Sequence, residues 1–125
     1  MRIFIKRNLI VVGLLAILST LLAAADATGT WKAQITAPDG NHDLTFALKA
    51  QGSSLTGTVT ENQKPADIQE GKAQGDTVSF SVMIDYQGQP LKIVYKGQVA
   101  GDEIRFTIGT EDGGWSTDFV AKRSS

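Results

Sequence analysis

Few residues in this sequence could carry nucleophilic catalysis. His42 is the only histidine among 125 residues, and there is no cysteine. A serine nucleophile needs a neighbouring base, and no serine stands in a Gly-x-Ser-x-Gly turn. Ser–Lys chemistry stays open, because several serines are present and nothing singles out one pair. We therefore expect a protein that is not an enzyme.

Acidic side chains could instead form the carboxylate pair that hydrolyses glycosidic bonds. The candidates are Glu61, Asp67, Glu70, Asp85, Glu111 and Asp112. Their even spread is typical of a solvated surface. The pairs 102–103 and 111–112 could hold Ca²⁺ weakly, but neither resembles an EF-hand loop. With one histidine and no ligand spacing, we expect no metal site and no cofactor.

The N-terminus has the pattern of a secretory signal peptide. Three basic residues among the first seven precede an apolar run over 9–22, and small residues then permit cleavage after Ala25 or after Ala27. This run is shorter than the roughly 20 residues of a transmembrane helix, although an uncleaved anchor stays an alternative. We predict a signal peptide over 1–25 and a single exported domain over 26–125, periplasmic or extracellular, without stable membrane insertion after cleavage.

The charge and size of the predicted mature chain limit its partners. Cleavage after Ala25 leaves 100 residues with nine basic and thirteen acidic side chains, a formal charge of −4. This acidic balance argues against nucleic acid or anionic lipid as the main partner. The length suits one small domain, and the absence of cysteine excludes disulfides and a lipid-modified cysteine. We expect a monomer that is stabilised by packing alone.

An internal repeat indicates how this domain is built. Residues 71–82 read GKAQGDTVSFSV, and residues 97–108 read GQVAGDEIRFTI. Each copy places Gly-Asp between two strands, and glycine at the first central position predicts a type II′ hairpin turn. After each turn apolar residues alternate with polar ones, which predicts antiparallel strands with one buried face.

The same alternation continues through the domain and predicts its fold. The expected strands are 29–36, 42–49, 55–60, 68–74, 77–85, 91–99, 103–109 and 115–123. Ile68 has an even number and Ala73 an odd one, so in a regular strand their side chains would point to opposite faces. This opposite parity predicts a bulge near Gly71. No apolar repeat of 3.6 residues follows residue 27. We therefore predict an all-β fold, an eight-stranded antiparallel up-and-down barrel, whose interior holds side chains or one small ligand.

Two residues are expected to cover one end of this barrel. The first and last strands of a closed meander lie side by side, so Trp31 at the start of one meets Arg123 at the end of the other. Gly29-Thr30-Trp31 with a late arginine resembles the lipocalin and wider calycin families, especially small exported bacterial lipocalin-like proteins. The resemblance implies a calycin-type barrel in which this pair is structural. Unlike true lipocalins, the chain is short and lacks their disulfides and C-terminal helix.

The opposite end, which we call the mouth end, is expected to carry longer connections at 37–41, 61–67, 86–90 and 110–114. Ligands enter barrels at such an end. By parity, His42, Glu61, Tyr86 and Trp115 point inward there and would form a rim. The apolar pocket beneath them would be lined by Phe46, Phe80, Tyr95, Phe106 and Phe119. The alternative is a filled core below ordinary loop residues.

These observations favour a binding protein for a small apolar ligand. Two other classes stay open. One is a protein–protein module, such as a protease inhibitor or an envelope-associated factor. The other is an enzyme or accessory protein that acts on carbohydrate through the acidic mouth loops and Trp115.

Overall fold

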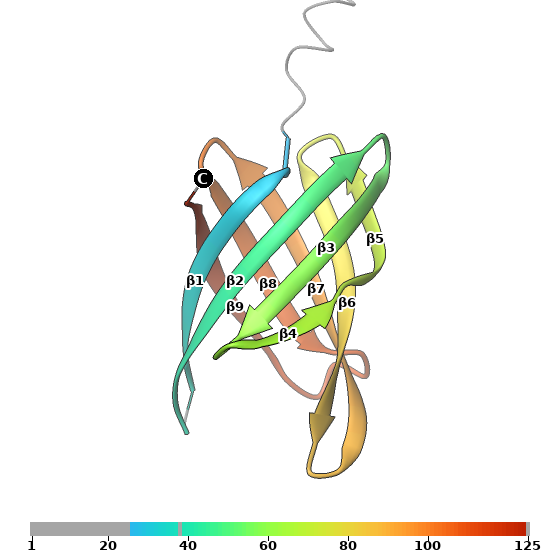
Figure 1. Ribbon diagram of the computed structural model, residues 1–125. Coiled ribbons are helices and arrows are strands. Elements are labelled where there is room, and N and C mark those ends of the chain that lie inside the picture. Colours follow the sequence, from blue (N-terminus) through green and yellow to red (C-terminus); the bar gives the residue numbers. More distant parts are fainter. Residues whose placement is uncertain (1–25, 38, 125) are drawn as a thin grey trace, which may run out of the picture.

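The computed structural model describes residues 26–37 and 39–124. The predicted signal peptide lies outside the described residues. The described residues form nine strands and no helix: β1 (Gly29–Ala37), β2 (Gly40–Gln51), β3 (Ser54–Glu61), β4 (Lys64–Asp67), β5 (Gln69–Gln74), β6 (Thr77–Tyr86), β7 (Gln89–Ala100), β8 (Glu103–Thr110) and β9 (Ser116–Arg123). The all-β prediction is confirmed (Figure 1).

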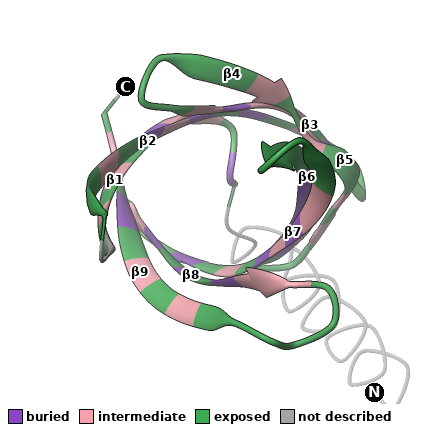
Figure 2. Ribbon diagram, turned by 90° about the horizontal axis from the view of Figure 1, so that it is seen from below, coloured by how far each residue is buried: buried purple, intermediate pink, exposed green. Residues whose placement is uncertain are grey.

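These strands close into one antiparallel barrel (Figure 2). Each strand pairs with the next one along the chain, except that β4 does not pair with β5, and β1 pairs with β9 through Trp31–Arg123 and Lys32–Lys122. β3 pairs with both β4 and β5. These two short strands therefore lie end to end and together occupy one strand position beside β3. The barrel is therefore eight-stranded, as predicted, with its fourth strand broken in two.

The short hairpins at the Trp31 end have the predicted turn type. Gly75 and Gly101 have φ of 59° and 62°, whereas the aspartate after each has a negative φ. The flanking residues Gln74–Thr77 and Ala100–Glu103 pair directly, so each turn has two residues. In a two-residue hairpin turn, a positive φ at the first central residue but not at the second is the mark of type II′. Glycine adopts a positive φ without steric cost.

The predicted bulge is also present. The register between β5 and β6 shifts between Gln69 and Lys72, and Glu70 has a φ of 55°. A Cβ on Gly71 would lie 2.0 Å from the carbonyl oxygen of Leu55, so only glycine fits beside β3 at this point. Ile68 immediately precedes β5 and Ala73 lies within it, and the bulge between them explains how both can pack against the core despite their opposite parity.

The connections at the mouth end differ from those expected. β1 and β2, β3 and β4, and β6 and β7 are each joined by only two residues. Only residues 111–115, between β8 and β9, form a longer loop among the described connections. These strands extend past the core into solvent, where most of their residues are exposed. A polar composition therefore does not distinguish such strand ends from loops.

Candidate functional site

Trp31 and Arg123 lie together where β1 pairs with β9. Trp31 is completely buried, and the Arg123 guanidinium carbon lies 4.2 Å from the centroid of the Trp31 ring. A cation over an indole face at this distance contributes about 0.5–2 kcal/mol. Arg123 Nε also lies 3.3 Å from Oδ1 of the exposed Asp102. The pair covers this end of the barrel.

The segment before β1 is fastened to the same end. The Trp31 indole N–H donates to the carbonyl of Ala27 at 2.9 Å, and Ala27 itself is 3% exposed. Arg123 donates to the carbonyls of Thr28 at 2.7 Å and Asp26 at 3.1 Å. The backbone N–H of Ala50 donates to Thr28 Oγ1 at 3.0 Å. Residues 26–28 are therefore part of the folded barrel.

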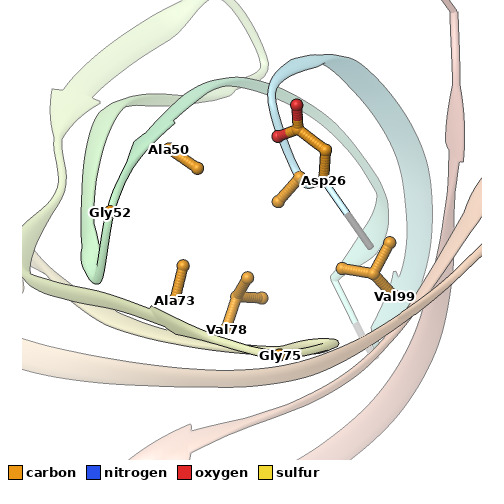
Figure 3. A pocket seen from close by; sticks show the side chains of 8 residues that line it. Asp26, Ala50, Gly52, Ala73, Gly75, Val78 and Val99 are labelled. Atoms are coloured by element: carbon orange, nitrogen blue, oxygen red, sulfur yellow. The ribbon is translucent and has the colours of Figure 1, made fainter. Parts of the chain in front are cut away.

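A pocket of about 270 Å³ opens at this Trp31 end (Figure 3). Its lining side chains are small or absent except for one carboxylate; the residues are Asp26, Ala27, Ala50, Gly52, Ala73, Gly75, Val78 and Val99. The backbone N–H of Thr28 donates to Asp26 Oδ1 at 2.9 Å, and this hydrogen bond lowers the pKa of Asp26. The pocket therefore combines small apolar side chains with an ionised carboxylate, and the exposed part of its lining is more polar than apolar.

Sequence reasoning did not find this pocket. Its space results from small side chains at strand ends that face each other across the barrel, such as Ala50 and Ala73. A single short side chain in a strand of alternating residues does not indicate a pocket by itself. The only usable hint is that the inward residues become smaller toward the Gly-Asp turns.

The five aromatic residues expected to line a pocket pack against one another. The centroid distances are 4.8 Å for Phe80–Tyr95, 4.9 Å for Phe46–Phe106 and 5.3 Å for Phe106–Phe119. Four of these side chains are buried, and Phe119 is half-buried against the same core. None of the five lines the pocket at the Trp31 end. Burial, with the nearby Glu61 charge, raises the pKa of Tyr95.

At the mouth end the structure brings two of the expected rim residues together. His42 Nδ1 lies 3.2 Å from Glu61 Oε2, across the β2–β3 pairing. His42 Nε2 lies 2.8 Å from Asp39 Oδ1, a partner that sequence reasoning missed because it follows from the tight β1–β2 turn. The pKa of His42 is raised, mainly because of its hydrogen bond to Asp39.

This contact predicts a pH dependence of stability. Because the pKa of His42 is raised in the folded state, protonated His42 stabilises the barrel. This stabilisation is fully present at pH values below the ordinary pKa of 6.5 and is lost as the pH rises through the raised pKa. His42→Gln should therefore destabilise the protein more at about pH 5.5 than at about pH 8.5. Urea unfolding at both values measures this difference. An equal loss at the two pH values would contradict it.

The other two expected rim residues are exposed to solvent at the mouth end. Tyr86 is 56% exposed at the tip of β6, and Trp115 is 48% exposed in the loop before β9. Met83 and Ile84 on β6 are exposed as well. We call these four residues the apolar tip. The β6–β7 hairpin that carries three of them projects beyond the barrel (Figure 1).

The β6 part of the apolar tip, which carries Met83, Ile84 and Tyr86, lies on an open sheet edge. Toward the mouth end, the pairing between β5 and β6 stops at Gln69–Ser81, whereas the pairing between β6 and β7 continues to Tyr86. Residues 82–86 therefore have no described strand partner on the β5 side. β4 pairs with β3 alone among the described strands, and Pro65 lies within it. Proline is tolerated at such edges because it donates no ladder hydrogen bond.

Several candidate carboxylates are occupied by local contacts. Lys92 Nζ lies 2.6 Å from Glu70 Oε1 and 3.0 Å from Glu111 Oε2, and these contacts raise the pKa of Lys92. Asp112 Oδ1 accepts from Thr110 Oγ1 at 2.7 Å and from the backbone N–H of Gly114 at 2.9 Å. These contacts order the loop between β8 and β9.

Within the described residues, no group of three or more His, Cys, Asp or Glu side chains is arranged to hold a metal ion. The same part of the chain contains no helix that is long and apolar enough to cross a membrane. Comparisons with protein-family models, curated proteins and solved structures found no match to the chain.

Proposed function

We propose that the protein is an exported, non-catalytic binding protein of the lipocalin-like type, which holds a small apolar ligand in the pocket at its Trp31 end. The observation that supports this proposal is the pocket itself, with its wall of alanine, glycine and valine. Ligand sites are concave and mostly apolar, with a few polar groups that orient the ligand. Here the ionised carboxylate of Asp26 is one such polar group, in a lining whose exposed part is more polar than apolar.

The volume limits the ligand. About 270 Å³ lies just below the roughly 300–1,000 Å³ of typical ligand pockets. A compact hydrocarbon or aromatic molecule suits this space better than a long acyl chain does. The aromatic core beneath the pocket prevents a long chain from passing through the barrel.

Filling the pocket should remove binding without unfolding the protein. Ala73 is half-buried and lines the pocket, so Ala73→Leu places a larger side chain in the ligand's space. Titration with small apolar probes, followed by tryptophan emission, should show affinity at least tenfold weaker in this variant. Ala100→Leu is the control, because Ala100 is exposed at the same end of the barrel. Equal affinity for all three proteins would contradict the proposal.

A protein partner at the mouth end is the second candidate. Met83, Ile84, Tyr86 and Trp115 expose large apolar side chains there, and the first three lie on the strand β6 with its open edge. Exposed apolar patches and unpaired edges mark interaction sites. A photo-crosslinker at position 115 should then give a discrete adduct in the exporting host that is lost with Tyr86→Ser. A crosslinker at Lys49, exposed on β2, should not give this adduct. Identical products from both positions would count against this candidate.

A further inference from the structure

The two possible leader cleavage sites differ in what they would leave of the barrel. Cleavage after Ala25 keeps Asp26 and Ala27, and cleavage after Ala27 removes both. Ala27 belongs to the buried core and lines the pocket together with Asp26. The two residues also supply carbonyl acceptors to Trp31 and Arg123. The choice of site therefore decides whether one end of the barrel is complete.

We propose that a leader peptidase hydrolyses the Ala25–Asp26 bond, so that the mature chain begins at Asp26 and its first residues form one wall of the pocket. Water adds to the Ala25 carbonyl carbon, and the C–N bond breaks. Ala25 leaves as a carboxylate and Asp26 keeps the nitrogen as a protonated α-amino group. This inference depends on the predicted signal peptide and not on the proposed ligand.

Cleavage after Ala27 would remove two hydrogen-bond acceptors. The buried Trp31 indole N–H would lose its acceptor, the Ala27 carbonyl at 2.9 Å, and a buried donor without a partner is costly. It would also remove the Asp26 carbonyl, which accepts a hydrogen bond from Arg123 Nη2 at 3.1 Å. Cleavage after Ala25 keeps both acceptors.

The first test uses the full-length gene expressed in a host that exports the product. Intact mass and N-terminal sequencing of the exported protein should show a chain that begins at Asp26 and contains 100 residues. A chain that begins at Thr28, or one that retains the leader, would overturn the proposal.

The second test measures what the two residues contribute. Chains that begin at Asp26 and at Thr28 are prepared separately, and their unfolding in urea is followed by Trp31 fluorescence. Loss of the indole acceptor should lower the folding equilibrium constant of the shorter chain by about 10- to 100-fold. Failure of the shorter chain to fold supports the same conclusion. Equal stability would refute it, whereas absence of a bound ligand would affect only the proposed function.

Discussion

Trp31→Ala should destabilise the barrel by about 3–5 kcal/mol, the range for removal of a buried aromatic side chain. Trp31 is 0% exposed, and its indole N–H holds the segment before β1. Its ring also supports the Arg123 guanidinium, which in turn binds that segment. Small domains have only about 5–15 kcal/mol of stability, so much of it would be lost.

Urea unfolding measures this effect, and the second tryptophan supplies the control. Trp115 is 48% exposed, so Trp115→Ala should change stability by less than about 0.5 kcal/mol. A loss below about 1 kcal/mol for Trp31→Ala would show that Trp31 does not close the barrel.

Phe46→Ala should cost a similar amount, about 3–5 kcal/mol, because it removes the ring at the centre of the aromatic core. Phe46 is 0% exposed and contacts the rings of Phe80, Tyr95, Phe106 and Phe119. Close-packed neighbours cannot collapse fully into the space that a deleted ring leaves.

The control for this prediction is an aromatic residue whose side chain is exposed to solvent. Tyr86 is 56% exposed, and Tyr86→Ala should have little effect on urea unfolding. If Phe46→Ala were equally mild, the interior would be loosely filled. The aromatic residues could then line a ligand cavity, as the sequence suggested.

The fold could be predicted from the sequence because each of its signals is local. Alternating residues such as Ile104, Phe106 and Ile108 identify a strand and its buried face. The Gly-Asp turns identify the hairpins, and strand order then places Trp31 beside Arg123. The broken parity of the fourth strand correctly indicated the bulge.

The candidate site was less predictable, because it depends on volume and on where the core ends. Parity placed Tyr86 and Trp115 on the inward side, yet the strands continue past the last core layer and both side chains reach solvent. Ala50 and Ala73 look unremarkable in sequence, but together they leave the space that becomes the pocket. His42 and Glu61 were expected near each other, whereas Asp39 joined them through a turn that the sequence presented as a longer loop.

Native mass spectrometry of the protein purified from its own exporting host tests the central claim most directly. The account predicts one small apolar molecule per wild-type chain, still present with Ala100→Leu and absent with Ala73→Leu. A wild-type protein that carries no molecule, or an Ala73→Leu protein that retains one, would contradict ligand binding at the Trp31 end.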